Sequence, residues 1–263
     1  MLDFHSHILP GLDDGASDME TALEMARMAV FDGITRMVAT PHYLEGVYEN
    51  DRDTILARTG EFQGILNSKG ILLELIPGCE AYLSPNIPEL LAKGKLITIN
   101  DNGKYLLVEL PMETIPEYTE DVLLELKGMG VTPIIAHPER NLEICRRTEL
   151  ALNLVQKGCL LQLNAGSFTG LYGDNIKKTA CFMANNSLIH LIGSDAHSCG
   201  GRSPGITKAW HILTAIDVKI PEEVKNINKR VLLGEKVDLK VPLYLHKEKR
   251  SLLGFFKGIF VDT

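Results

Sequence analysis

The stretch "DFHSHILPGLDDGA", residues 3–16, places two histidines one residue apart and follows them with a turn that carries two further carboxylates. Side chains of a β-strand alternate between its two faces, so His5 and His7 are predicted to point the same way. Two imidazoles on one face, with Asp14 close behind, form a geometry that can chelate a metal ion. A plainer interpretation is also open, in which one histidine is hydrogen-bonded in the core and the other is exposed.

The composition is that of one ordinary globular domain. The chain has 263 residues, of which 45% are hydrophobic and 23% are charged, and α/β barrels of this length often form a single domain. No apolar run approaches the roughly 18 residues that a membrane span requires. The first predicted strand begins at the N-terminus and leaves no room for a signal peptide. We therefore expect a cytoplasmic protein without a transmembrane segment.

Net charge and cysteine usage exclude two further classes. A net charge of -7 and a sequence pI near 5.6 argue against a protein that coats nucleic acid, because that binding rests on surplus Lys and Arg. The cysteines are odd in number, widely spaced and without a C-x-x-C pair: Cys79, Cys145, Cys159, Cys181 and Cys199. This pattern favours reduced thiols over a disulfide framework or a zinc finger.

Short apolar runs alternate with helical patterns along the chain. A helix is predicted over residues 17–33, with Ser17 and Glu20 as a capping box and Gly33 as its stop. Further helices are predicted near residues 50–68, 119–128, 141–157, 174–186 and 204–216. Strands are predicted within residues 2–8, 36–42, 71–78, 105–111, 131–139, 160–166 and 188–197. Strands that are apolar on both faces and alternate with helices predict a parallel sheet covered by helices.

Nearly every predicted strand ends in a potential metal ligand. In chain order these side chains are His5, His7, His42, Glu80, Glu109, His137, Asp195 and His197. In a closed barrel all strand ends meet at the C-terminal mouth, whereas an open doubly wound sheet would spread them along a line. We therefore predict a single-domain α/β fold, a closed or distorted barrel.

Each of these residues has another interpretation when taken singly. Glu109 can be an edge-strand carboxylate, and His137 can cap the turn that follows it. Together, however, such side chains are costly to bury unless they pair or bind metal. A divalent transition metal takes four to six ligands, so the set predicts two or three ions that share bridging carboxylates. Nitrogen and oxygen ligands without thiolate suit manganese, iron or zinc.

Seven short motifs carry these residues: HSHILPGLDDGA, ATPH, GCE, VELP, AHPERN, LQLNAGSF and GSDAH. Together they resemble the polymerase and histidinol phosphatase (PHP) superfamily, over residues 1 to about 240. Within it the chain resembles the bacterial PHP-type protein-tyrosine phosphatases encoded with capsule and exopolysaccharide synthesis genes. The resemblance implies a distorted (β/α)7 TIM-like barrel, a trinuclear and typically Mn²⁺-dependent site, and hydrolysis of phosphotyrosine on a cognate bacterial tyrosine kinase.

The resemblance also implies a role for nine side chains. By that pattern His5, His7, Glu80 and Asp195 bind one ion, Glu80, Glu109 and His137 a second, and Asp14, His42 and His197 a third. The chemistry agrees, because two ions ~3.5–4 Å apart lower the pKa of a bridging water and neutralise phosphate oxygens. The expected nucleophile is thus a metal-bridging hydroxide.

Two arginines lie in the same predicted loops. Arg140 stands in HPERN and Arg202 in GGRSP, and a planar guanidinium can bind two phosphate oxygens at once. A solvated surface role is the alternative for each. A phenolate leaving group, with a free pKa of ~10, needs less help from a general acid than an alkoxide would. We leave the general acid unassigned.

Other hydrolase classes lack their motifs. None of the cysteines has an arginine six positions on, as a cysteine-dependent phosphatase requires. Neither a G-x-x-x-x-G-K-[ST] phosphate loop nor a G-x-S-x-G nucleophile elbow occurs. Two alternatives to a tyrosine phosphatase stay open: a small-molecule phosphoesterase such as a histidinol-phosphate phosphatase, and a non-catalytic kinase-binding scaffold.

The C-terminal segment differs in composition from the barrel, so we divide the chain into a barrel over residues 1–240 and a tail over residues 241–263. If the tail is helical, one face behind a basic cluster carries Leu252, Leu253, Phe256, Ile259 and Phe260. Such a face is typical of a peripheral membrane or partner contact, and packing against the barrel is the alternative.

Overall fold

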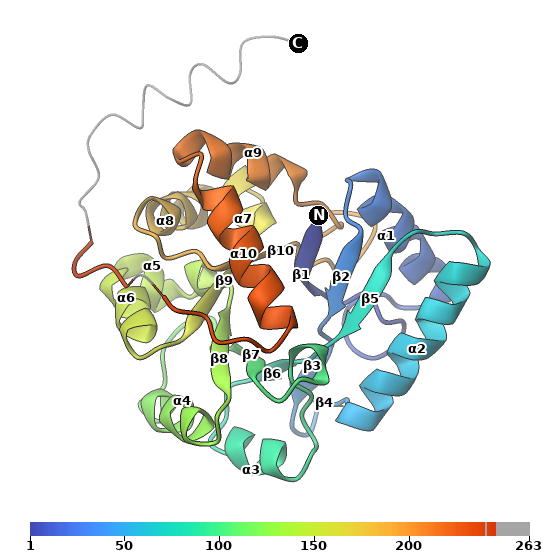
Figure 1. Cartoon of the computed structure of the whole chain (residues 1–263), viewed down its shortest axis with the longest axis horizontal. Helices are drawn as coiled ribbons and strands as arrows, with labels where there is room; N and C mark the ends of the chain where they lie inside the picture. The colour runs from blue at the N-terminus through green and yellow to red at the C-terminus, as the bar shows by residue number, and fades with distance from the viewer. Residues whose placement is uncertain (240, 246–263) are drawn as a thin grey trace.

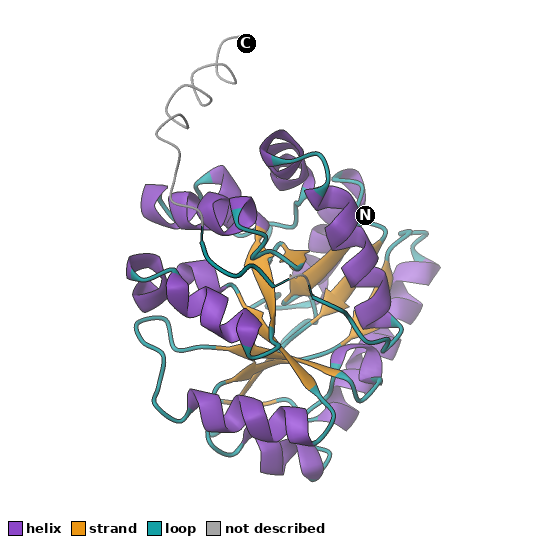
Figure 2. Cartoon of the chain, turned by 60° about the vertical axis from the view of Figure 1, so that its left-hand side comes forward, coloured by secondary structure: helices purple, strands orange, loops and turns teal. Residues whose placement is uncertain are grey.

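A computed structural model describes residues 1–239 and 241–245 of the chain. Strands occupy the centre and helices surround them (Figure 1), and Figure 2 shows the same arrangement from a second side. None of the helices in the described residues is long and apolar enough to cross a membrane. The apolar face predicted over residues 252–260 lies outside the described residues, and the domain boundary at residue 240 stays a prediction.

The strands form two sheet segments of one distorted barrel. Their orders are β1-β2-β5 and β10-β9-β8-β7-β6-β3-β4, and every pair is parallel except β3 with β4. A bridge between Ser6 and Ala196 joins the end of β1 to the segment after β10. The bounds are β1 Leu2–Ser6, β2 Arg36–Ala39, β3 His42–Leu44, β4 Tyr48–Glu49, β5 Glu74–Pro77, β6 Glu80–Tyr82, β7 Tyr105–Glu109, β8 Thr132–Ala136, β9 Leu160–Asn164 and β10 Leu191–Gly193.

The second predicted strand, residues 36–42, is broken in two, and the third, residues 71–78, is followed by a separate strand that the sequence pattern did not predict. β2 ends at Ala39 before β3 begins at His42, and β5 ends at Pro77 before β6 begins at Glu80. Proline has no N–H for the sheet ladder, and Pro41 lies in the first break while Pro77 borders the second. His42 and Glu80 therefore begin new strands, and they are direct neighbours in the β3–β6 register.

Helical segments follow the barrel strands, which confirms the predicted α/β barrel. α1 ends just before Gly33, whose φ of 86° suits a helix stop. The α-helices are α1 Met19–Phe31, α2 Arg52–Ser68, α3 Ile87–Ala92, α4 Thr119–Gly128, α5 Leu142–Arg146, α6 Glu149–Gln156, α7 Ala165–Thr169, α8 Asp174–Asn185, α9 Thr207–Ile216 and α10 Ile220–Leu232. Two 3-10 turns, η1 Ile99–Asp101 and η2 Pro138–Arg140, complete the described elements.

Two helix predictions need correction. Asp18, and not Ser17, caps α1, because Asp18 is extended and its carboxylate accepts the N–H of Thr21. The hydroxyl of Ser17 donates to Asp18 instead. The helix predicted over residues 141–157 is two helices, since the backbone at Arg147 leaves the helical region with φ -140° and ψ 75°.

The barrel interior is apolar and is closed at its amino-terminal end by α10, a helix that the sequence pattern did not predict. α10 lies across the centre of the ring in Figure 1, and the side-chain amides of Asn100 and Asn102 donate to its last carbonyls, on Leu232 and Val231. The inner core consists of Leu2, Phe4, Val38, Ile76, Ile99, Tyr105, Leu107, Ile134, Ala136, Leu160, Leu191, Val231 and Leu232. Apolar side chains thus fill the barrel below the carboxyl ends of the strands, where the polar groups gather.

Candidate metal centre

All nine predicted ligands converge at the carboxyl ends of the barrel strands. They come from β1 and the loop after it, from the first residues of β3 and β6, from the last residue of β7, and from the loops after β8 and β10. The nine are His5, His7, Asp14, His42, Glu80, Glu109, His137, Asp195 and His197. Their binding of metal ions stays a prediction.

Glu80 is the centre of the cluster. Its Oε2 lies 3.1 Å from Nε2 of His5 and 3.2 Å from Nε2 of His7, which confirms that the two histidines face the same way. The same oxygen lies 3.1 Å from Nδ1 of His42, and Oε1 lies 3.0 Å from Nε2 of His137. Complete burial raises the pKa of Glu80, but the surrounding imidazoles outweigh burial and hold this pKa well below its ordinary value. Glu80 is therefore a carboxylate.

Asp195 connects the histidines to the two arginines. Its Oδ1 lies 3.5 Å from Nε2 of both His5 and His7, while Oδ2 accepts a hydrogen bond of 2.7 Å from Arg140 and forms an ion pair of 2.7 Å with Arg202. Burial opposes ionisation of Asp195, yet His5 and the other cations lower its pKa. Both predicted arginines thus lie at the mouth of the barrel and not on a remote surface.

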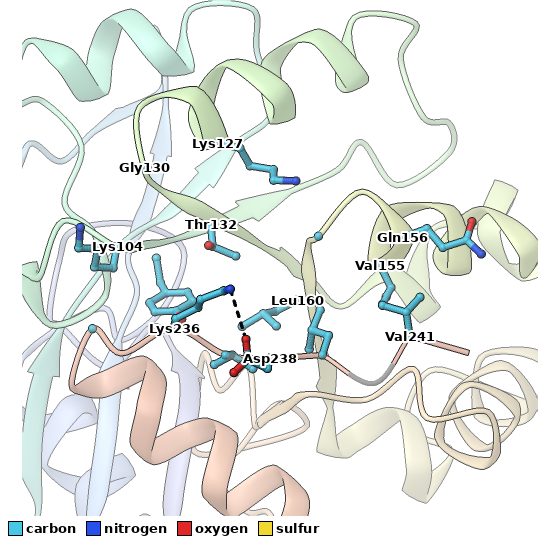
Figure 3. A pocket seen from close by; sticks show the side chains of 15 residues that line it. Lys104, Lys127, Gly130, Thr132, Val155, Gln156, Leu160, Lys236, Asp238 and Val241 are labelled. Atoms are coloured by element: carbon cyan, nitrogen blue, oxygen red, sulfur yellow. Dashed lines mark ion pairs between the residues drawn. The ribbon is translucent and has the colours of Figure 1, made fainter. Parts of the chain in front are cut away.

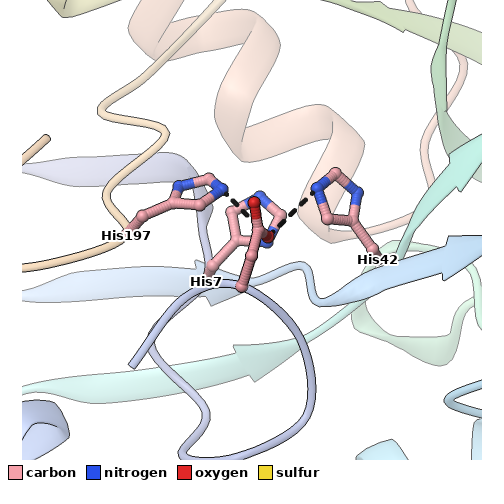
Figure 4. A group of neighbouring side chains, drawn as sticks. His7, His42 and His197 are labelled. Carbon is pink, nitrogen blue, oxygen red and sulfur yellow. Dashed lines mark ion pairs between the residues drawn. The ribbon is translucent and has the colours of Figure 1, made fainter. Parts of the chain in front are cut away.

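Asp14 marks the outer side of the cluster. Its Oδ1 lies 3.5 Å from Nε2 of His42 and 3.5 Å from Nε2 of His197, so the two imidazoles face one carboxylate oxygen beside His7 (Figure 4). Half of the Asp14 side chain is exposed. Burial and the neighbouring His7 lower the pKa of His197 to about 3, which leaves this imidazole neutral and able to donate a lone pair.

Glu109 lies on the inner side of the ligand cluster, beside His137 and His42. Its Oε1 lies 3.6 Å from Nε2 of His137, and its Oε2 lies 3.9 Å from Nδ1 of His42. Burial, together with the charges of Glu80 and Asp195, raises the pKa of Glu109 to about 9. Burial and these two charges thus favour the protonated form of Glu109.

The ligand atoms form three overlapping groups. The groups are His5, His7 and Glu80; His42, Glu80 and Glu109; and His7, Asp14, His42 and His197. His7, His42 and Glu80 each belong to two of these groups, whereas His137 and Asp195 belong to none of them. Shared ligands of this kind fit closely spaced ions.

Two backbone features show how tightly the site is built. His137 and Asp195 have left-handed backbones, with φ of 30° and 55°, a conformation that costs energy for residues other than glycine. Gly193 leaves space for His5, because a Cβ at residue 193 would lie 2.5 Å from the Cβ of His5. Gly15 leaves space for His7 in the same way.

Three polar residues beside the ligands escaped the sequence prediction. Asp13 Oδ2 lies 2.7 Å from Nδ1 of His7 and also accepts the backbone N–H of His42. The other two, Gln162 and Asn164, lie in β9. The signals were present: two aspartates are adjacent in LDDG, and polar side chains alternate with leucine in LLQLN.

The amides of β9 fix the orientation of His5. Asn164 Nδ2 donates to Asp195 Oδ2 at 2.8 Å, so Asn164 Oδ1 accepts from Gln162 Nε2 at 2.9 Å. Gln162 Oε1 then faces Nδ1 of His5 at 2.8 Å and can only accept. The proton of neutral His5 therefore lies on Nδ1, and Nε2 presents its lone pair to the cluster.

A cavity of about 610 Å³ lies at the opposite end of the barrel (Figure 3). Lys104, Thr132 and Leu160, at or next to the amino ends of β7, β8 and β9, line it, and Lys236 pairs with Asp238 at its edge. It contains no histidine and none of the nine predicted ligands. The nine predicted ligands are at the other face, where barrel enzymes carry their active sites.

Comparisons with known proteins find relatives over nearly the whole chain. The chain is 36% identical over 257 residues to tyrosine-protein phosphatase YwqE of Bacillus subtilis, covering 97% of this chain and 100% of YwqE. A crystal structure from work on YwqE and on CpsB from Streptococcus pneumoniae, described as unique metal-dependent tyrosine phosphatases, superposes with a TM-score of 0.88 at 33% identity, over 94% of this chain and 100% of that chain.

A more distant structure shares the fold alone. Histidinol phosphate phosphatase from Lactococcus lactis matches with a TM-score of 0.51 at 12% identity, over 86% of this chain and 93% of that chain. A family model described as capsular polysaccharide synthesis, CpsB/CapC, matches residues 1–232. Because this match spans most of the barrel and the YwqE match spans nearly the whole chain, the chain belongs to the CpsB/CapC family.

Proposed function

We propose that this chain is a metal-dependent protein-tyrosine phosphatase that hydrolyses phosphotyrosine on a bacterial tyrosine kinase of capsule or exopolysaccharide synthesis. The observation that carries the proposal is the convergence of nine candidate ligands around Glu80, with Arg140 and Arg202 at the edge of the same cluster. The names of the relatives supply the substrate class, since YwqE and CpsB are called tyrosine-protein phosphatases.

The residues present fit a group of divalent ions. Two buried oxygens, Oε2 of Glu80 and Oδ1 of Asp195, have no hydrogen-bond partner and instead face imidazole nitrogens. A buried charged oxygen without a donor is costly unless a cation neutralises it. Histidine and carboxylate ligands without thiolate suit manganese, iron or zinc, and we propose Mn²⁺ as the native ion. All nine predicted ligands would bind two or three ions.

The bound ions would supply an activated water and positive charge for the phosphate oxygens. The protein's own residues would orient the ligands and bind the phosphate. The acceptors on Asp13 and Gln162 keep the protons of His7 and His5 on Nδ1, so that each Nε2 is free to bind a cation. Arg140 and Arg202 already point at one carboxylate oxygen, and their remaining N–H groups can bind the phosphate of the substrate.

We also propose that the protein acts in the cytoplasm. The five cysteines are all free, which suits the reducing cytoplasm, where a phosphotyrosine segment of a kinase would be presented. We retain a peripheral contact through the tail, residues 241–263, as a prediction only, because residues 246–263 lie outside the described part of the chain.

The test is turnover of a phosphotyrosine peptide before and after metal removal. Chelation should abolish hydrolysis and Mn²⁺ should restore it, because nothing else in the described site replaces the ions. Cys199→Ser is the matched control, and it should keep full activity because no cysteine takes part. Full activity after exhaustive chelation would contradict the proposal.

The same assay separates the alternatives. Faster hydrolysis of histidinol phosphate than of phosphotyrosine peptide would favour a small-molecule phosphoesterase. A fully metal-loaded protein that hydrolyses neither substrate, yet binds the kinase, would favour a scaffold.

A further inference from the structure

A tyrosine at the mouth of the barrel has no role in the function proposed so far. Tyr172 lies in the loop between α7 and α8, and its hydroxyl is buried without a hydrogen-bond partner. Nε of Arg202 is buried without an acceptor as well. Burying a donor without an acceptor costs on the order of 1–3 kcal/mol, so two such donors at one site call for an explanation.

The ring of Tyr172 is fixed in place. The guanidinium carbon of Arg140 lies 4.5 Å from the centre of this ring, in a cation–π contact. Gly166, in the first turn of α7, makes space for the ring, because a Cβ there would lie 3.2 Å from Cε2 of Tyr172. The ring therefore packs between Gly166 and the guanidinium of an arginine that itself reaches Asp195.

The neighbouring carboxylate does not satisfy the hydroxyl. Oδ2 of Asp195 already accepts hydrogen bonds from Arg140 and Asn164 and forms an ion pair with Arg202, so the two lone pairs of this oxygen are occupied. Burial and the charge of Asp195 raise the pKa of Tyr172, so this phenol is neutral and carries a proton to donate. Around the hydroxyl the site offers donors and positive charge, and Oδ2 of Asp195 is no longer free to be its acceptor.

A phosphate monoester supplies that acceptor. Its non-bridging oxygens are anionic and can each accept hydrogen bonds, as the donors on Tyr172 and Arg202 require. We propose that Tyr172 is a substrate-binding residue whose hydroxyl donates a hydrogen bond to a non-bridging phosphate oxygen, beside Arg202. The assignment rests on the proposed phosphatase function, and it involves no proton transfer to the leaving group.

The test is Tyr172→Phe, which removes the hydroxyl and keeps the ring under Arg140. The probe is inorganic phosphate, titrated by calorimetry into the Mn²⁺-loaded protein, with peptide kinetics alongside. We expect phosphate binding to weaken about 10-fold and kcat/KM to fall roughly 10- to 100-fold, the range for a lost hydrogen bond to a charged group. Metal content should not change. The melting temperature should be equal or higher, because the lost hydroxyl has no partner in the protein.

Tyr105→Phe is the matched control. The hydroxyl of Tyr105 donates to the carbonyl of Glu235 at the far end of the barrel, so phosphate affinity should match the wild type. Phosphate affinity of Tyr172→Phe within twofold of the wild type would overturn the assignment, even if turnover fell. Phosphate binding needs no turnover, so a chain that fails to hydrolyse phosphotyrosine still tests Tyr172 independently of the proposed function.

Discussion

Acid sensitivity of the fold should depend on one buried histidine remote from the metal centre. His190 precedes β10, and its Nδ1 accepts the backbone N–H of Leu161 at 2.9 Å. The backbone N–H of His190 donates to the carbonyl of Leu161 at 3.0 Å. Burial lowers the pKa of His190 to about 4, so the folded protein keeps this imidazole neutral.

The magnitude of the effect comes from proton linkage. An unfolded histidine has a pKa of about 6.5, so between pH 6.5 and pH 4 the unfolded chain binds a proton that the folded chain does not. The free energy of unfolding therefore decreases as pH falls through this window. Between pH 7 and pH 5, His190 alone should remove about 2 kcal/mol from it.

The variant that tests this reasoning is His190→Asn. Its side-chain oxygen can accept the N–H of Leu161 in place of Nδ1, and the amide does not titrate. We would measure the free energy of unfolding of the chelated protein by urea at pH 7 and at pH 5. The decrease in this free energy from pH 7 to pH 5 should be about 2 kcal/mol smaller for the variant than for the wild type. Equal losses for the two proteins would refute the linkage to His190.

Two further predictions concern the metal centre. Arg202→Ala should keep its metal, because Arg140 still holds Asp195, but turnover of phosphotyrosine peptide should fall about 30- to 1000-fold as a phosphate contact is lost. Arg140→Ala should have the same effect. If either variant keeps wild-type rates and unchanged inhibition by phosphate, that arginine does not bind the phosphate and has only a surface role. Gln162→Leu removes the acceptor for Nδ1 of His5 and should weaken Mn²⁺ binding about 10- to 100-fold in a metal titration. Unchanged metal affinity in that variant would mean that the contact with His5 is incidental.

Local features of the sequence were enough to predict the barrel and the eight candidate ligands at its strand ends, whereas the full set of nine ligands came from the family resemblance. Alternation of strand and helix patterns predicts a parallel sheet, and polar side chains at the ends of apolar runs mark its carboxyl edge. The spacing of His5 and His7 predicts their common direction, and the structure confirms it with their Nε2 atoms 3.1 Å apart. These inferences need only neighbours a few residues away.

Sequence patterns failed where the deciding contact is distant along the chain. Gln162 reads as one polar residue in an apolar strand, and only the barrel brings it to His5, 157 residues earlier. His42 and Glu80 become register neighbours only through the pairing of β3 with β6. In the sequence Tyr172 is an ordinary loop residue, and only the folded chain shows that Arg140 packs over its ring. Backbone periodicity is encoded locally, whereas the partner of each polar side chain is decided by which strand ends the closed barrel brings together.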